Sequence, residues 1–436
     1  MQNHLTESRL AGMWRDLISR EDTLVTAAGE PLRVVYPGRL NDDRGADFRD
    51  AVIISGDNVR RGSIELHVKS SDWEAHGHHL DPAYNDVILH VVFQEDGHLD
   101  ARRANGETVD TLSMYRYLEK RLQFANVTLP CYRVAAGVPE KVKEFLENIG
   151  MVRFRGKTDQ FRNDLAEMDA GQALYRGIMG ALGYSKNKIP CLKLAEYIPL
   201  SQLESLINRE NSSENAILQS QALLLGTAGL LPSQRARVSG NTETYVNILE
   251  KYWSVKGRRK VLSPGSWNLF KVRPNNSPLR RLAAITYLIQ RYRETGLSAS
   301  LVELAEDTPV AYPARLVANL LVSTDGYWAS HYDFGRACAR LSPALLGPDR
   351  AGEIIINVIF PFIAALGDSA LGSKAREMYR VYPALPPNAI EKHLRYQLGL
   401  APDAVGSASR QQGLIHLYKT RCTQGKCMEC PFNKCN

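Results

Sequence analysis

The sequence predicts an α+β protein in which a mixed N-terminal domain of helix and strands precedes a large all-α region. Apolar residues recur with helical spacing at the start of the chain and with the two-residue period of strands between residues 32 and 93. From about residue 139 the spacing is helical almost to the end. The chain closes on CTQGKCMECPFNKC, whose four cysteines predict a metal loop.

Length and composition set the class of protein. With 436 residues, 44% of them hydrophobic, the chain can bury more than one core. Its first residues, MQNHLTESRLAGMWRDLISRE, carry scattered charges and lack the apolar region of a signal peptide. The longest apolar stretch, 354–366, is too short to span a bilayer and predicts a buried helix. We therefore expect a cytoplasmic protein with no membrane partner and with domains at 1–135, 136–400 and 401–436.

The N-terminal domain is predicted element by element. One apolar stripe marks a first helix over about twenty residues; it comprises Leu10, Met13, Trp14, Leu17 and Ile18. Strands are predicted at 32–36, 51–55, 63–68 and 87–93. The last two are separated by SSDWEAHGHHLDPAYND, a short helical or irregular link, and a hairpin is expected around 103–114. The resulting order is αβββαβ.

Polar residues alternate along the strand at 63–69. Side chains of a strand point to opposite faces in turn, so one face carries Ile64, Leu66 and Val68 and the other carries Glu65, His67 and Lys69. We expect the apolar row to pack on helices and the polar row to line a surface. Asp47 and Asp50 flank the start of the preceding strand, so either is expected beside Glu65.

This layout resembles the PD-(D/E)XK nucleases, which have a restriction-endonuclease-like fold. The resemblance implies that Asp47 and Glu65 bind Mg²⁺ or Mn²⁺, hard cations that prefer carboxylate oxygens. His67 stands at the position of the Lys that orients the attacking water in these enzymes, with Lys69 two residues on. Glu7 on the first helix is a candidate for an additional acid. The alternative interpretation is a strand whose polar face is only solvated.

Histidines are concentrated in the same region. Six of the ten lie within 32 residues: His67, His76, His78, His79, His90 and His98. His90 is expected on the polar face of its strand, which it can share with His67. A zinc site formed by His76, His78 and Asp81 is one interpretation of the link, and a solvated loop is the other.

Several short motifs extend over most of the chain. They are G-x-L-N at 38–41, G-x-D-F at 45–48, I-E-x-H at 64–67, S-D-W at 71–73, AYNDVILHVV at 83–92 and RPNNSPLRRL at 273–282. Together with the cysteine tail they resemble a bacterial family of proteins that share a domain of unknown function, number 2851. The resemblance implies a bacterial origin and a shared fold, and it implies no established activity.

The cysteine tail has the spacing C-x4-C-x2-C-x4-C, formed by Cys422, Cys427, Cys430 and Cys435. Four thiolates this close in a chain without an export signal favour a metal over disulfides. The tail is similar to the iron–sulfur loop of the endonuclease III family, in which the outer gaps are longer. The cofactor is thus a 4Fe-4S cluster or zinc, and the alternative is a frayed tail that binds no metal. Cys131, Cys191 and Cys338 are isolated and are expected to be ordinary core or surface residues.

Positive charge is concentrated between residues 251 and 295, which contain eleven Lys or Arg and one acid. The net charge of the chain is +7, so the remainder is net negative. Aromatic residues lie between these cations, a pattern typical of nucleic-acid binding. The predicted contacts are Lys256, Arg258, Arg259, Lys260, Lys271, Arg273, Arg280 and Arg281. An acidic protein, anionic phospholipid or a merely solvated helix face would also fit these charges.

These patterns favour a metal-dependent nuclease acting on DNA or RNA. A second hypothesis from a different class is a non-catalytic nucleic-acid-binding or scaffold protein that retains the nuclease-like fold. A third is an enzyme that uses a histidine-bound metal on another phosphate or amide substrate.

Overall fold

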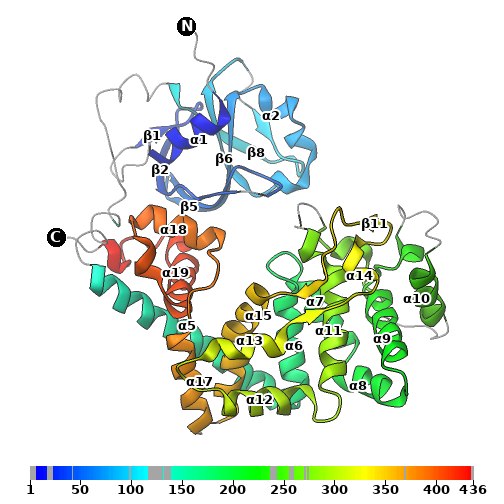
Figure 1. Cartoon of the computed structure of the whole chain (residues 1–436). Coiled ribbons are helices and arrows are strands. Elements are labelled where there is room, and N and C mark those ends of the chain that lie inside the picture. Colours follow the sequence, from blue (N-terminus) through cyan, green and yellow to red (C-terminus); the bar gives the residue numbers. More distant parts are fainter. Residues whose placement is uncertain are drawn as a thin grey trace. The chain divides into compact units, whose positions relative to one another are not determined.

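The computed structural model describes residues 6–16, 23–41, 43–97, 100–115, 131, 139–235, 243–254, 260–269, 272, 274–367 and 370–433. The chain forms two compact units (Figure 1). The first unit comprises residues 1–150, 387–406 and 410–436, and the second comprises 151–386 and 407–409. The C-terminal helix and tail thus share a unit with the N-terminal sheet, where the sequence suggested a segment of their own.

A mixed eight-stranded sheet organises the first unit, with the order β1-β2-β4-β5-β6-β8-β7 and β3 paired to β4. Its strands are β1 (Leu24–Val25), β2 (Pro31–Tyr36), β3 (Arg39–Leu40), β4 (Phe48–Ser55), β5 (Asn58–Lys69), β6 (Val87–Gln94), β7 (Ala101–Arg102) and β8 (Thr108–Ser113). The β5–β6 and β6–β8 pairs are parallel and the other pairs are antiparallel. All four predicted strands and the hairpin are therefore present.

Helix α1 (Glu7–Asp16) covers one face of this sheet, as the apolar stripe predicts. Leu10 and Trp14 are fully buried and pack in one cluster with Ile64 and Leu66 of β5. The Trp14 indole N–H donates to the carbonyl oxygen of Pro37 at 3.1 Å, so the polar edge of this buried ring is satisfied. Residues 17–20 of the predicted helix lie outside the described residues.

A short link joins the parallel strands β5 and β6. It contains α2 (Asp72–Ala75), η1 (His78–Leu80) and η2 (Pro82–Tyr84). Gly62 on β5 is required where the link returns, because a Cβ atom there would meet the Asp86 carbonyl oxygen at 2.3 Å. The buried Trp73 anchors α2, and its indole N–H donates to the Arg102 carbonyl oxygen at 2.8 Å.

The C-terminal elements complete the first unit. They are α18 (Ala389–Leu398), α19 (Ala408–Thr420), η8 (Pro402–Val405), η9 (Cys422–Gln424) and η10 (Pro431–Asn433). Together with the first part of α5 (Pro139–Glu167) they enclose an apolar cluster that includes Tyr36 and Val52 of the sheet. The Tyr418 hydroxyl donates to Asp50 Oδ2 at 2.6 Å, which joins α19 to β4.

The second unit is mainly helical around one large core. Its helices after α5 are α6 (Ala170–Leu182), α7 (Lys188–Tyr197), α8 (Leu200–Arg209), α9 (Ser213–Thr227), α10 (Thr244–Ser254), α11 (Pro278–Arg291), α12 (Leu297–Asp307), α13 (Leu316–Leu320), α14 (Tyr327–Ser330), α15 (Pro348–Ile354), α16 (Phe360–Ala365) and α17 (Ala370–Val381). Single 3₁₀ turns occur at η3 (Pro232–Gln234), η4 (Pro264–Ser266), η5 (Pro274–Asn276) and η6 (Pro313–Arg315). The predicted helical region is confirmed.

Two features of this unit differ from a purely helical region. Short strands form two antiparallel pairs, β9 (Val322–Ser323) with β12 (Ala344–Leu346) and β10 (His331–Asp333) with β11 (Arg336–Ala337). The buried helix predicted at 354–366 contains a π-helical turn, η7 (Ile355–Ile359), just before Pro361. Proline has no N–H to donate to a preceding carbonyl, so the wider turn accommodates it within a continuous buried segment.

Within the described ranges, none of the helices combines the length and the apolar character needed to cross a membrane.

Candidate metal centre

The loop between β3 and β4 positions the first carboxylate. The Asn41 side-chain amide donates to the Ala46 carbonyl oxygen at 2.9 Å, and the Asn41 backbone N–H donates to the Asp47 carbonyl oxygen at 2.6 Å. Gly38 has φ +87, and a Cβ atom there would meet the Arg49 carbonyl oxygen at 2.8 Å. These residues belong to the G-x-L-N and G-x-D-F motifs, which therefore fix the position of Asp47 at the start of β4.

Asp47 lies beside Glu65, as one of the two sequence alternatives expected. The Asp47 backbone N–H donates to Glu65 Oε2 at 2.9 Å, and Asp47 Oδ2 accepts from the Leu66 N–H at 3.0 Å. Asp50 points elsewhere, because the register of β4 shifts between Phe48 and Ala51 and its carboxylate is bonded to Tyr418. Asp47 is therefore the carboxylate that accompanies Glu65.

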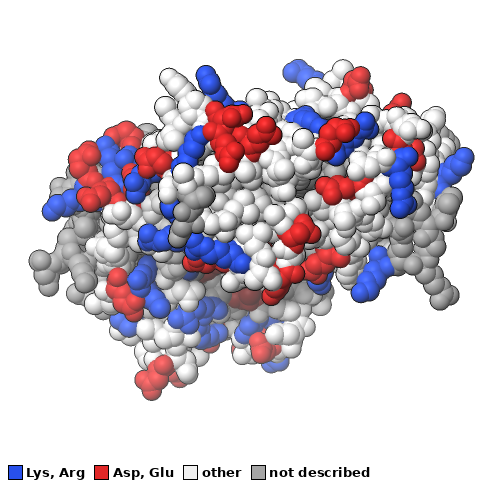
Figure 2. All heavy atoms as spheres, turned by 90° about the horizontal axis from the view of Figure 1, so that it is seen from below, with Lys and Arg blue, Asp and Glu red and all other residues white. Residues whose placement is uncertain are grey.

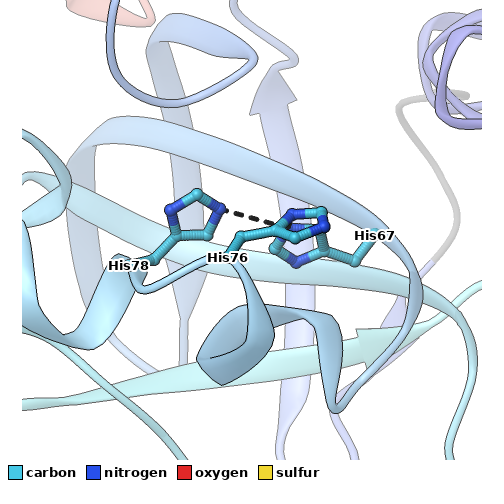
Figure 3. Close-up of side chains that lie close together, drawn as sticks. All are labelled: His67, His76 and His78. Atoms are coloured by element: carbon cyan, nitrogen blue, oxygen red, sulfur yellow. Dashed lines mark hydrogen bonds between the residues drawn. The ribbon is translucent and has the colours of Figure 1, made fainter.

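Three histidines lie close together, and two of them, His67 and His78, face the Glu65 carboxylate. His67 lies on β5, His76 follows α2 and His78 begins η1, and their rings point toward one another (Figure 3). His67 Nε2 is 3.1 Å from His76 Nδ1 and 3.2 Å from His78 Nε2. Glu65 Oε1 is 3.1 Å from His78 Nε2 and 3.6 Å from His67 Nε2. One nitrogen of each histidine lies within 4.8 Å of the others, a spacing that allows a single metal ion to bind all three.

His90 fixes the orientation of His67. It is the register partner of Glu65 on the parallel strand β6, and its Nε2 is 2.8 Å from His67 Nδ1. This contact occupies Nδ1 of His67 and leaves Nε2 to face the centre. A hydrogen bond to the second ring nitrogen is the usual way in which a protein sets the tautomer of a metal-binding histidine.

Aromatic side chains enclose the centre on the side of the link. The Tyr84 ring stacks on His78 with 3.8 Å between ring centroids, and Trp73 lies 5.1 Å from His90 and 5.5 Å from His78. As a result Glu65 and His67 are only 6% and 1% exposed, so the polar row of β5 does not line an open surface as the sequence predicted. His76 is the exposed member of the three histidines.

Burial changes the pKa of every buried member of this group. It raises the pKa of Glu65 to about 8, and burial together with the Glu65 charge raises the pKa of Asp47 to about 7. Burial and the neighbouring histidines lower the pKa of His67 to about 2, and burial lowers the pKa of His90 to about 3. The two imidazoles are therefore neutral at pH 7, the protonation state in which a histidine binds metal.

This protonation pattern makes metal binding depend on pH. A cation that binds the carboxylates displaces their protons, so we expect the Kd for Mn²⁺ or Zn²⁺ to weaken about tenfold per pH unit between pH 8 and 6. Isothermal titration across this range measures the effect. A Kd that is constant over these two units would contradict the assignment.

The same shifts set the stability of the metal-free protein. Because the folded pKa of Glu65 lies above its ordinary value of 4.5, its contribution to stability is full below pH 4.5 and is lost as the pH rises through about 8. A bound cation compensates for the buried negative charge, so the increase in Tm on adding metal should be larger at pH 8 than at pH 6. Thermal unfolding with and without metal at both pH values tests this.

Three further residues singled out in the sequence, Lys69, Asp81 and Glu7, are not among the converging histidines. Lys69 is the last residue of β5 and is exposed. Asp81, considered as a zinc ligand with His76 and His78, accepts from Arg44 at 2.7 Å and from the Ala83 N–H at 2.9 Å. His67, and not Asp81, is the third residue that lies with His76 and His78. Glu7 on α1 is exposed, and its negative charge contributes to the raised pKa of Glu65.

Residues 7–389 match the family described as "Protein of unknown function (DUF2851)". The chain belongs to this family. No curated protein and no solved structure matched the chain in the corresponding comparisons. The DUF2851 match includes Asp47, Glu65 and all four histidines of the centre and ends before the cysteine tail.

The basic segment of this DUF2851 protein is described only in part. Lys256, Arg258, Arg259, Lys271 and Arg273 lie outside the described residues. Lys260 is exposed, with its ammonium 5.6 Å from the centroid of the Tyr197 ring. On the face in Figure 2, Lys and Arg are interspersed with Asp and Glu among the residues that are coloured by charge.

Arg280 and Arg281 are buried, with 0% and 5% exposure. The Arg280 guanidinium donates to the carbonyl oxygens of Trp328, His331, Ser342 and Ala344. Arg281 donates to the Leu345 carbonyl oxygen and to Tyr184 and Asn276. Both guanidinium groups are thus turned inward to bind the 328–345 segment and are not available to a phosphate, so we do not include them in a nucleic-acid interface.

We expect Arg280→Ala to destabilise the second unit strongly. The substitution leaves several buried carbonyl groups without a donor, and each such loss costs about 1–3 kcal/mol, which gives about 3 kcal/mol or more in total. Thermal unfolding of the full chain measures the change. Arg293→Ala is the matched control, since Arg293 is partly exposed and pairs with Glu294. Equal Tm values for the two variants would contradict a structural role for Arg280.

The cysteine tail is described as far as residue 433. Cys422 and Cys430 are buried, Cys427 is half-buried and Cys435 lies outside the described residues. Burial raises the pKa of Cys422 well above its usual range and that of Cys430 to about 11. Arg421 opposes this shift at Cys430 only in part.

Proposed function

We propose that this chain is a metal-dependent phosphodiesterase, a nuclease that acts on DNA or RNA. The observation that carries the proposal is the convergence of two carboxylates and three histidines at Asp47, Glu65, His67, His76 and His78. Carboxylates and imidazoles are common ligands of divalent cations. A divalent cation beside an ionisable carboxylate can promote the hydrolysis of phosphate esters.

The proposed ligands are Glu65, His67, His76 and His78. His67 and His78 present Nε2 and His76 presents Nδ1 toward one point. Imidazole nitrogens favour Mn²⁺, Zn²⁺ or Fe²⁺ over Mg²⁺, so Mn²⁺ fits this mixed set better than the Mg²⁺ that carboxylates alone would allow. His90 acts as a positioning residue through its contact with His67 Nδ1.

In the proposed reaction the cation and the Asp47 carboxylate have different roles. A bound divalent cation polarises the phosphate and makes water a better nucleophile at neutral pH. Asp47 is partly exposed, and its pKa of about 7 allows its carboxylate to accept a proton from the attacking water near neutral pH. Glu65 and the neutral His67 remain fixed by their contacts to the Asp47 N–H and to His90.

The arrangement of elements supports a nucleic-acid substrate. Asp47 precedes β4, Glu65 and His67 lie on β5, a short helical link follows, and β6 runs parallel to β5. This order corresponds to the PD-(D/E)XK layout expected from the sequence, with His67 at the position of the usual Lys. The overall charge of +7 is also favourable for a polyanionic substrate.

One observation favours a second candidate, a hydrolase that acts on another phosphate or amide substrate. His76 and His78 add imidazole ligands that the PD-(D/E)XK layout does not include, and they make the donor set richer in nitrogen. Zinc hydrolases of several substrate classes use such sets.

A substrate panel tests the proposal and separates the candidates. Metal-stripped protein is supplied with Mn²⁺, Zn²⁺ or Mg²⁺ and offered single- and double-stranded DNA, RNA, an aryl phosphate and an amide. We expect cleavage of a nucleic acid with Mn²⁺. Turnover of the aryl phosphate or amide alone would favour the second candidate. Salt-sensitive nucleic-acid binding without cleavage would favour a non-catalytic binding protein.

A further inference from the structure

Three arginines lie on the hairpin of β3 and β4, whose loop leads into Asp47. Arg39 is on β3, Arg44 is in the loop and Arg49 is on β4. Side chains alternate between the two faces of a strand, and Phe48 is buried in the core beneath α1. Arg49 therefore points to the opposite face of the sheet, the face on which the metal centre lies.

Arg39 and Arg49 are directly opposite each other in the antiparallel β3–β4 pair. Like charges in such positions destabilise a sheet. Arg39 donates to the Leu40 carbonyl oxygen at 3.2 Å, and Arg49 donates to the Arg44 carbonyl oxygen at 2.6 Å. In the part of the chain that the structure describes, no acid forms an ion pair with either guanidinium. The hydrogen bonds to carbonyl groups leave both positive charges uncompensated.

The loop of this hairpin packs against the link between β5 and β6. Arg44 forms an ion pair with Asp81 of the link at 2.7 Å, and its side chain is 56% exposed. A Cβ atom on Gly45 would be 3.2 Å from the Ala83 carbonyl oxygen of the link and 3.4 Å from Arg49 Nη2. The Arg49 guanidinium therefore lies where the loop meets the link, next to the metal centre.

We propose that Arg44 and Arg49 bind a backbone phosphate of a nucleic acid, the neighbour of the phosphate that the metal ion contacts. This inference rests on the proposed nucleic-acid substrate and names the part of it that these side chains hold. Guanidinium groups bind phosphate oxygens through paired N–H donors. A phosphate here also neutralises the charge that the opposed Arg39 and Arg49 leave uncompensated. A substrate with a single phosphate or an amide has no group for this position, so the subsite favours a polynucleotide.

Oligonucleotide binding in EDTA tests the proposal without requiring cleavage. Full-length protein is titrated into a short fluorescein-labelled single strand at several salt concentrations, with DNA and RNA of one sequence compared. For Arg49→Gln we expect the Kd to rise about tenfold and the slope of log K against log salt to fall by about 0.7, the value for one phosphate contact. A wild type that binds neither strand, or a variant with wild-type Kd and slope, would overturn the proposal.

Two further variants show whether the effect is local and depends on charge. Arg33→Gln is the matched control, because Arg33 is an exposed arginine of β2 that pairs with Ile54, further along β4. It should keep the wild-type slope, and a fall equal to that of Arg49→Gln would reduce the effect to total charge and overturn the proposal. Arg49→Lys keeps the charge and should restore the slope. A slope as low as that of Arg49→Gln would also contradict a phosphate contact.

Thermal unfolding and Mn²⁺ titration separate phosphate binding from a structural role of Arg49. Arg49→Gln removes the repulsion from Arg39, so its Tm should not fall below that of the wild type, and its Kd for Mn²⁺ should be unchanged. A lower Tm or weaker Mn²⁺ binding combined with a wild-type slope would assign Arg49 to holding the loop and overturn the proposal.

Cleavage by the wild type is measured separately, so that the subsite and the nuclease function can fail independently. If the wild type cleaves no nucleic acid but Arg49→Gln shows the expected loss of binding and slope, the subsite stands and the nuclease function fails. If the wild type cleaves and Arg49→Gln binds as the wild type does, the nuclease function stands and the subsite fails.

Discussion

Replacing Glu65 with Gln is expected to lower phosphodiester hydrolysis on the order of 10³-fold. Glu65 Oε1 faces His78, and its Oε2 accepts from the Asp47 N–H. Glutamine has nearly the size of glutamate and keeps an oxygen that can accept the hydrogen bond from Asp47. It lacks the negative charge that offsets the cation. A loss of about 4 kcal/mol of charge stabilisation corresponds to that decrease in rate. Steady-state kinetics at a fixed Mn²⁺ concentration measure it.

Glu74→Gln is the control for this substitution. Glu74 lies nearby on α2, is exposed, and undergoes the same chemical change. It should hydrolyse substrate at the wild-type rate. The account of Glu65 is wrong if Glu65→Gln retains wild-type activity, or if both variants lose activity equally.

The second large effect is expected at His76. His76→Ala removes one of the three nitrogens that converge on the centre, and we expect metal affinity to fall by a factor of about 100 or more. His76 is exposed, so its removal leaves no cavity in the core and the Tm of the metal-free protein should stay unchanged. Isothermal titration with Mn²⁺ and Zn²⁺, with thermal unfolding in parallel, measures both quantities.

His79→Ala is the matched control, because His79 is three residues further along the same link and is not in the converging group. It should bind metal with the wild-type Kd. Wild-type affinity in His76→Ala would show that His76 is not a ligand. A similar loss in both variants would indicate disruption of the link and no specific role for His76.

Much of the first unit could be predicted because its signals are local. The alternation of apolar and polar residues from 63 to 69 predicted that Ile64 and Leu66 pack on helices while Glu65 and His67 share the other face, and the structure places Ile64 and Leu66 against α1. The motif before β4 predicted that Asp47 or Asp50 would approach Glu65. The shift in strand register between Phe48 and Ala51 determines that Asp47, and not Asp50, lies beside Glu65. A single sequence does not reveal such a shift.

The remaining parts depend on contacts distant in sequence. His76 and His78 meet His67 only because the link between parallel strands folds back over β5, with Gly77 at φ +75 between the two histidines. The sequence predicted that Arg280 binds nucleic acid. Its actual partners are carbonyl groups about 50 to 60 residues away along the chain, which the sequence pattern does not reveal. Cys131 showed no spacing relationship to the tail, and only the fold places it there.

The central claim is that Glu65, His67, His76 and His78 hold one divalent cation. Crystals grown with saturating Mn²⁺ test it most directly, because anomalous scattering locates the ion. We predict a peak about 2.0–2.2 Å from the Glu65 carboxylate, His67 Nε2, His76 Nδ1 and His78 Nε2. The absence of a peak among these four side chains at saturating Mn²⁺ would contradict the account.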